Sequence, residues 1–376
     1  MTATRPANGR RLVITRWSAI SPFGLGRKAF QEGMRTGRKT VTAIDGEQWS
    51  APERRACLVP DFSVRELLGK KGTRDMDRVT GLAVGATAQL LGDDSGGPSI
   101  PTGEGTGLVL GTTTGSAESM MGYTRTSMRK PKPYLVDPAL MPYAVMNCAA
   151  GQCAIWHGLK GPNATIAGGP SAGLLALVYA RRLLASGRAE RILWGAAEEF
   201  SAARSWIEHH RRGGEAVDSV LGEGSTMFLL ESKNDADAES DYEFERQPLA
   251  DVIDVRSRTH SRGAVRGALA RCVSDVLERN GVHPGEVWAI APSGMQTQYA
   301  DQESDALHDC FPRADARWIQ VTDLLGDTGA AGATFQIAAT LSLAGPETAG
   351  RVAVITSVDR DGTVACSLIR TRGEAR

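Results

Sequence analysis

One short segment of the chain combines a serine with the local geometry that activates nucleophiles. Gly169-Pro170-Ser171-Ala172-Gly173 fits the pattern G-x-S-x-G, between a short apolar strand and a helix. In that pattern a sharp turn presents the serine hydroxyl for acyl transfer, and an acid and then a histidine must follow in the chain. No downstream histidine stands in a motif suited to that role; they are His209, His210, His260, His283 and His308. A serine hydrolase or acyltransferase that uses Ser171 therefore stays the alternative interpretation.

The flanks of this segment support a different interpretation. Residues 147–152 read NCAAGQ, and residues 158–165 read GLKGPNAT. These phrases resemble N-x-A-A-G-Q and G-L-x-G-P-N-x-T of the β-ketoacyl-ACP synthases in the thiolase superfamily. In that family they lead to a nucleophilic cysteine in T-A-C-A-S-G, and an alignment without a gap places Pro170 on this cysteine. Proline has no nucleophilic side chain, but it suits the first turn of a helix, so the fold is kept without the reaction.

The same resemblance identifies further catalytic places, and each carries a different residue here. Ser293 stands where the family's H-G-T-x-T has its histidine, and Gly326 stands where G-H-x-x-G-A-A-G has its histidine. The lysine that supports the second histidine falls on Val321. The gating loop G-F-G-G becomes residues 359–362, with Arg360 at the phenylalanine place. Coordinated loss at these positions implies a subunit that does not condense acyl units by itself.

A ketosynthase-like chain without its catalytic groups resembles the chain length factors of type II polyketide synthases. The resemblance implies a heterodimer with an active ketosynthase subunit, a cavity shaped for the growing acyl chain, and an acyl carrier protein that delivers extender units. It implies no cofactor. Factors of aromatic systems carry glutamine at the cysteine place, so proline favours a divergent branch such as the reducing, polyene-forming systems. A transferase that uses Cys148 or another thiol is a third possibility.

Two groups of residues follow from this resemblance. Ketosynthases pair through the strand before the nucleophile, which corresponds here to Asn163, Ala164, Thr165, Ile166 and Ala167. The loop and helix after residue 111 approach the dimer interface in that family and help to bound the acyl tunnel. Candidate tunnel residues are Thr112, Ser116, Met120, Met121 and Met128. Methionine adapts its shape to an acyl chain, although ordinary core packing explains these methionines equally well.

The elements around these residues alternate between strands and helices. Short apolar runs predict strands at 11–15, 108–111, 191–198 and 226–231, and the polar run 232–241 predicts a linker. Strands at 252–255, 287–290, 352–355 and 364–369 and helices at 263–280 and from 329 follow it. We therefore expect an α/β, thiolase-like fold in which two similar halves, 1–232 and 242–376, form a layered α-β-α-β-α core.

Composition narrows the classes of partner. The 376 residues carry 43 basic and 43 acidic side chains, so net charge indicates neither nucleic acid nor a membrane surface as a partner. No apolar run reaches the ~18 residues of a membrane span, and no signal peptide is recognisable. The six cysteines are scattered without a C-x-x-C pair, which predicts buried thiols in a reducing cytoplasm and no metal site.

Overall fold

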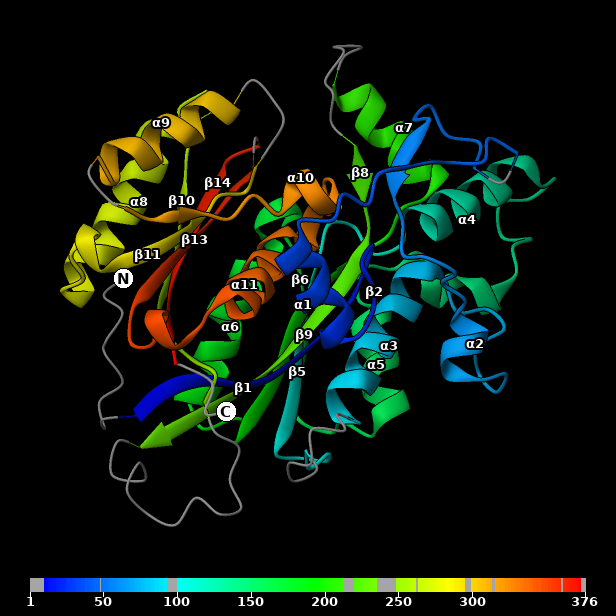
Figure 1. Cartoon of the computed structure of the whole chain (residues 1–376). Helices are drawn as coiled ribbons and strands as arrows, with labels where there is room; N and C mark the ends of the chain where they lie inside the picture. Colours follow the sequence, from blue (N-terminus) through cyan, green and yellow to red (C-terminus); the bar gives the residue numbers. More distant parts are fainter. Residues whose placement is uncertain are drawn as a thin grey trace.

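A mixed β-sheet runs through the molecule and carries both halves of the chain (Figure 1). The structure is a computed structural model, and it describes residues 10–47, 49–92, 100–212, 220–234, 248–261, 263–294, 299–312, 315–359 and 361–372. Within these residues the strands of the sheet lie in the order β12 (Arg317–Trp318), β11 (Val287–Ala291), β13 (Val352–Asp359), β14 (Thr363–Thr371), β10 (Ala250–Thr259), β1 (Arg10–Ser21), β9 (Gly224–Asn234), β7 (Arg191–Glu198), β5 (Thr106–Thr112) and β6 (Asn163–Ala167). β2 (Gly24–Leu25) pairs with β1 beside this path.

The pairing pattern of one half of the sheet repeats in the other half. β6 and β7 both lie parallel to β5, and β9 pairs antiparallel with β7 and with β1. In the second half, β12 and β13 both lie parallel to β11, and β14 pairs antiparallel with β13 and with β10. β1 and β10 join the halves antiparallel, with Val13 opposite Asp251. The α/β fold with two similar halves is therefore confirmed.

Helices pack on both halves of the sheet and also lie between the two halves. Two clusters of buried apolar residues form where α3 and α5 pack on the first half and where α8 and α9 pack on the second. A third cluster lies between the halves, around α1, α6 and α11 (Figure 1). The helices named here and below are α1 (Arg27–Thr36), α2 (Val64–Leu68), α3 (Arg78–Leu91), α4 (Ala117–Arg129), α5 (Cys148–His157), α6 (Ala172–Ala185), α7 (Ala202–Arg211), α8 (Val265–Asn280), α9 (Ala300–Cys310), α10 (Thr322–Leu325) and α11 (Gly332–Leu343).

The predicted linker begins too early. Ser232 continues β9, which pairs with β1 as far as Asn234, opposite Arg10. The polar run still forms a strand because β1 supplies hydrogen-bonding partners along its whole length. The rest of the predicted linker lies outside the described residues, and the boundary between 1–232 and 242–376 stays a prediction.

Small residues let the central helices approach the sheet. β5 is buried along its whole length, as expected for a strand covered on both faces. A Cβ on Gly111 would lie 2.9 Å from the backbone of Ala172, at the start of α6. A Cβ on Gly173 would lie 3.0 Å from the methyl group of Thr334. These glycines therefore bring the start of α6 close to β5 and to α11.

Shorter elements complete the region around the central helices. β3 (Thr42–Ala43), β4 (Arg55–Cys57) and β8 (Leu221–Gly222) form a small sheet beside α7. Short 3₁₀ helices are η1 (Pro138–Ala144), η2 (Gly169–Ser171), η4 (Pro284–Glu286), η5 (Gly329–Ala331) and η6 (Pro346–Thr348). Within the described part of the chain, no helix is long and apolar enough to cross a membrane.

Candidate functional site

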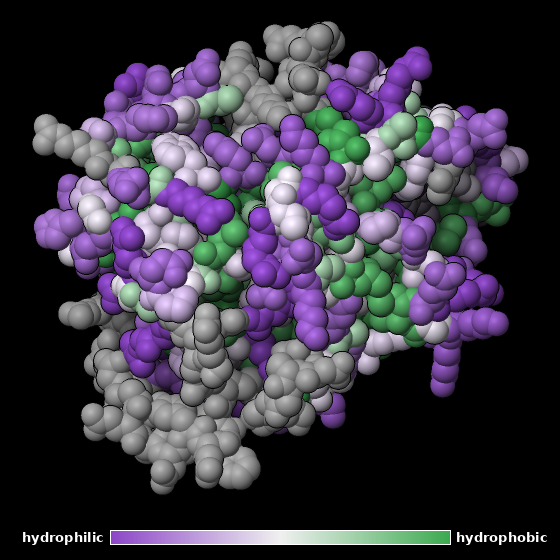
Figure 2. Space-filling model, viewed as in Figure 1, coloured by the Kyte–Doolittle hydropathy of each residue, from purple (hydrophilic) through white to green (hydrophobic). Residues whose placement is uncertain are grey.

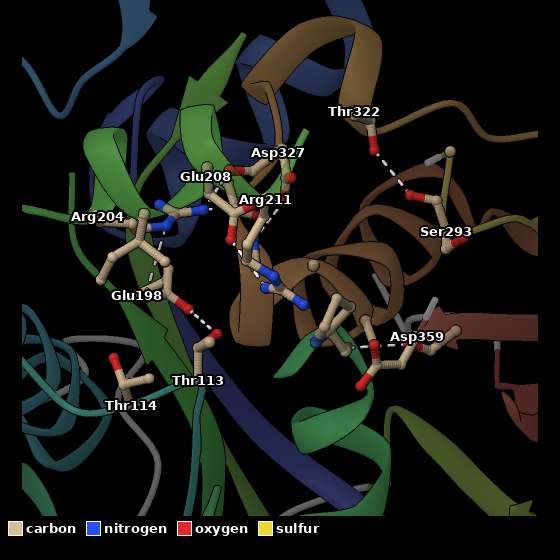
Figure 3. Close-up of a pocket in the computed structure, with 18 of the residues that line it drawn as sticks. Thr113, Thr114, Glu198, Arg204, Glu208, Arg211, Ser293, Thr322, Asp327 and Asp359 are labelled. Atoms are coloured by element: carbon tan, nitrogen blue, oxygen red, sulfur yellow. Dashed lines mark hydrogen bonds and ion pairs between the residues drawn. The ribbon is translucent and has the colours of Figure 1, made fainter. Parts of the chain in front are cut away.

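A cavity of about 130 Å³ lies where the two halves meet, at the ends of β5, β7, β11 and β13 (Figure 3). Ligands of open α/β sheets bind at the carboxyl ends of strands, so this is the expected place for a site. Pro170 and Ser293 both line the cavity. The structure thus brings together two positions that are far apart in the chain and that the sequence singled out.

Pro170 lies in η2, immediately before α6. Gly169, with a φ of 54°, makes the tight turn that leads into it. The carbonyl oxygen of Pro170 accepts a hydrogen bond from Ser357 Oγ at 2.9 Å, which ties the turn to β13 in the other half. The predicted turn into a helix is present, with Pro170 in the short 3₁₀ helix that precedes α6, and Pro170 offers the cavity no reactive group.

The hydroxyl group of Ser293 is already engaged. Its Oγ donates to Glu303 Oε2 at 2.5 Å, and its backbone N–H donates to Oε1 of the same carboxylate at 2.9 Å. Glu303 is buried and also accepts a hydrogen bond from Thr356 Oγ1 at 2.8 Å. Ser293 therefore serves to close the end of β11 onto α9, with its proton directed to Glu303.

The other two predicted positions do not line the cavity. Val321 is buried in the central apolar cluster. Gly326 has a φ of 70°, and a Cβ there would lie 2.6 Å from the carbonyl oxygen of Val220. A larger side chain at Gly326 would thus require the backbone to move. The next residue, Asp327, lines the cavity instead (Figure 3).

A buried arginine organises the wall of the cavity. Arg204 donates through Nη1 to the carbonyl oxygens of Glu199 and Gly222, at 2.8 and 2.7 Å, and through Nη2 to that of Asp327 at 2.9 Å. Its Nε lies 3.8 Å from Glu198 Oε1, and its Nη2 lies 3.9 Å from Asp327 Oδ1. The guanidinium group thus joins α7 to the ends of β7 and β8 and to the loop before η5 (Figure 3).

Two consecutive carboxyl groups, those of Glu198 and Glu199, lie at the end of β7. Glu198 accepts hydrogen bonds from Thr113 Oγ1 and from the backbone N–H of Ala330, at 3.1 Å for the latter. Burial raises the pKa of Glu198, although the Arg204 guanidinium acts in the opposite direction. Burial, together with the nearby Asp77 carboxylate, raises the pKa of Glu199 to about 8. These groups were missed from the sequence, where two acidic residues directly after an apolar strand are the available signal.

The alternative nucleophile, Ser171, has no histidine as a hydrogen-bonding partner. Ser171 is fully buried, and its Oγ lies 3.3 Å from Ser357 Oγ. The structure describes all six histidines, and none of them has Ser171 as a hydrogen-bonding partner. His209 and His210, the first two of the downstream set, lie beside Trp206 on α7. No histidine is thus placed to activate Ser171.

The candidate tunnel residues lie on the loop and helix beside the cavity rather than in its wall. Thr112 and Ser116 are buried, and Ser116 caps the N-terminus of α4 through the N–H of Ser119. On α4, Met121 and Met128 are exposed by 41% and 82%. None of these residues lines the cavity; their neighbours Thr113 and Ala117 do. Met120 lies on the same helix, and Arg360 lies outside the described residues.

The predicted pairing strand lies at an edge of the sheet. β6 pairs with β5, from Asn163 opposite Leu108 to Ala167 opposite Thr112, and no described strand lies on its other side. α5 contacts β6, η1 contacts α5, and α4 contacts η1. This side exposes a set of large apolar side chains, the outer apolar patch, which consists of Met128, Tyr134, Leu135, Leu140, Met141, Val145, Met146 and Ile155.

The outer apolar patch is unusual for the surface of this chain. In Figure 2 polar side chains cover most of the visible face, and apolar areas gather in the half of the view that holds α3, α4 and α5 in Figure 1. Ile155, on α5, is 76% exposed. Several large apolar side chains exposed within one region are typical of surfaces that contact other proteins.

Comparison with known proteins identifies the family. Residues 9–236 match the family described as "Beta-ketoacyl synthase, N-terminal domain", and the chain therefore belongs to the β-ketoacyl synthase family. It is 26% identical to 3-oxoacyl-[acyl-carrier-protein] synthase 2 of Rhizobium meliloti over 413 aligned positions, which cover 97% of this chain and 96% of the relative. The corresponding protein of Staphylococcus aureus (strain COL) is 26% identical over 362 positions, or 88% of this chain and 85% of the relative.

Comparison with solved structures shows which members of the family this chain is similar to. A chain of the ishigamide ketosynthase/chain length factor is similar with a TM-score of 0.89 and 43% identity, over 96% of this chain and 100% of that one. A type II polyketide synthase acyl-carrier protein in complex with its ketosynthase includes a chain with a TM-score of 0.78 and 18% identity, which supports the fold alone. The chain is thus ketosynthase-like and similar to a chain of a ketosynthase/chain length factor.

Proposed function

We propose that this chain is a chain length factor, a non-catalytic subunit that pairs with an active ketosynthase and shapes the cavity in which a polyketide grows. The chemistry of its own cavity is the observation that carries the proposal. Among the described residues that line it, none is a cysteine, a histidine or a lysine. Condensation by a ketosynthase needs a thiolate and proton-transfer groups, and Pro170 and Ser293 supply neither.

The similarity to the ishigamide ketosynthase/chain length factor supports this assignment, because it extends over almost the whole chain at 43% identity. Proline at position 170, in place of the glutamine of aromatic-system factors, favours a reducing, polyene-forming system. All six cysteines are free thiols, which supports the cytoplasm as the compartment.

The edge strand and the outer apolar patch support pairing with a ketosynthase. An unpaired strand edge offers backbone donors and acceptors to a second chain, and apolar side chains beside it supply the area that a stable interface buries. The strand from Asn163 to Ala167 would thus pair with the corresponding strand of the partner. In this arrangement α4 approaches the interface, and Met121 and Met128 would border the shared cavity that holds the acyl chain. The acyl carrier protein would deliver extender units to the active subunit.

Coexpression with a cysteine-bearing ketosynthase tests the proposal. We expect the two chains to copurify as a heterodimer that elongates carrier-bound acyl chains, and we expect this chain alone to be inactive. Elongation by the isolated chain, or a stable homodimer that binds no ketosynthase, would overturn the proposal.

The outer apolar patch offers a matched pair of variants. Ile155→Asp places a charge in the patch, so we expect at least a tenfold weaker heterodimer. Leu25→Asp changes an exposed apolar residue on β2, outside the patch, and should leave the dissociation constant unchanged. Equal binding by both variants, with unfolding temperatures equal to that of the wild type, would contradict the assigned interface.

A further inference from the structure

One buried carboxylate connects the first turns of two helices. Glu199 follows β7 and is 1% exposed. Its Oε2 accepts a hydrogen bond from the N–H of Val79, in the first turn of α3, at 3.3 Å. Its Oε1 accepts one from the N–H of Glu118, in the first turn of α4, at 3.2 Å. The first N–H groups of a helix have no partner within the helix, so a carboxylate between two helix starts holds both.

The capping residues of the two helices strengthen the same connection. Ser116, the N-cap of α4, donates its hydroxyl proton to Glu199, with oxygen–oxygen distances of 3.1 and 3.2 Å. Asp77, the N-cap of α3, accepts from the N–H of Thr80 at 2.9 Å and from Ser119 Oγ of α4 at 3.2 Å. Each helix start is therefore bonded to a carboxylate that also bonds the other helix.

Most of α4 lies near the surface of the protein. The structure describes all residues of this helix, and Ala117 alone among them is buried. α4 also packs against η1 and α7, and the side chain of Glu118, in its first turn, accepts a hydrogen bond from the N–H of Ala203 at 3.0 Å. The hydrogen bonds of α4 to Glu199 and Asp77 all lie in its first turn or at its N-cap, so they contribute to the direction in which the helix runs.

We propose that Glu199 is a positioning residue that sets the direction of α4 and so determines the length of acyl chain that the heterodimer produces. The proposal rests on the proposed function, because α4 borders a product cavity only in a heterodimer. Glu199 does not line the cavity next to Pro170, so it would act through α4 and not by contact with the acyl chain. A shift in the direction of α4 would move Met121 and Met128 most, because they lie beyond its first turn.

The test is the distribution of product lengths. Heterodimers of an active ketosynthase with the wild type or with Glu199→Ala would elongate acyl chains, and mass spectrometry would measure their lengths on the carrier protein. We expect the share of the main product to fall at least twofold in Glu199→Ala, with neighbouring lengths in its place. Ser119→Ala removes only the bond to Asp77, so we expect a smaller change in the same direction.

Asp254→Asn is the matched control. Asp254 is also buried and hydrogen-bonded, to Arg181 and Arg256, but it lies on β10, away from α4. It should lower the unfolding temperature and leave the product lengths unchanged. If Glu199→Ala does not fold, Ser116→Ala decides the question, because it removes the hydroxyl group that donates to Glu199. An unchanged length distribution in an active Glu199→Ala or Ser116→Ala heterodimer overturns the role of Glu199. A wild-type heterodimer that does not elongate overturns the proposed function instead.

Discussion

Replacement of Arg204 by methionine should strongly destabilise the protein. Methionine has similar length but donates no hydrogen bond, so the carbonyl oxygens of Glu199, Gly222 and Asp327 would each lose a partner. Removal of one partner from a buried ion pair costs about 3–5 kcal/mol. Glu198 can take up a proton when the Arg204 guanidinium is removed. We therefore expect a loss of stability of about 3 kcal/mol, at the low end of this range.

Equilibrium unfolding in urea measures this loss. Arg204→Lys keeps the charge but not the planar arrangement of donors, so we expect a smaller loss of about 1–3 kcal/mol. Arg35→Met is the matched control, because Arg35 forms an exposed ion pair with Glu32, whose removal changes stability by at most about 0.5 kcal/mol. A loss below about 1 kcal/mol in Arg204→Met would refute the argument that this guanidinium holds the cavity wall together.

Three further predictions concern other parts of the site. Pro170→Cys should restore no condensation in the isolated chain, because a thiol at this place still has no histidine beside it; elongation by this variant would contradict the inactive-site argument. The raised pKa of Glu199, about 8 against 4.5, means that the folded state binds a proton that the unfolded state releases above pH 4.5. The contribution of Glu199 to stability should thus fall as the pH rises from about 5 to 8, by at most about 1.4 kcal/mol per pH unit, and Glu199→Gln should make the dependence of stability on pH less steep in urea titrations at several pH values. Gly222→Ala should prevent stable folding, because its Cβ would lie 2.0 Å from the carbonyl oxygen of Leu325, whereas Gly46→Ala, with no atom within 4 Å, should unfold like the wild type.

Much of the fold could be predicted because the sequence contains motifs that are typical of the family's strands and helices. The apolar strands, the repeated halves and the helix start at Pro170 depend on local patterns and on the order of elements. Ser293 and Pro170 stand in phrases that resemble those around catalytic residues in the family, and both line the cavity. The end of β9 was not predicted, because Ser232 and Lys233 are polar and form a strand only through their pairing with β1.

The wall of the cavity could not be predicted in the same way. Arg204, Glu198 and Asp327 come from three separate segments, and each is polar enough to be read as a surface residue. The motif alignment singles out Gly326, which has no side chain, and it gives no sign that the neighbouring Asp327 lines the cavity. Burial of a charged group depends on contacts between distant segments, and a single sequence does not show them.

The pairing of β1 has a consequence for synthesis of the chain on the ribosome. β1 ends at Ser21, but its neighbours β9 and β10 begin at Gly224 and Ala250. Translation at about 5–20 residues per second separates β1 from β9 by roughly 10–40 s. During that time an apolar strand that is buried in the native sheet lacks its two long neighbours, β9 and β10, and is exposed to aggregation. Efficient production of this chain should therefore depend on chaperones that bind its N-terminal segment early.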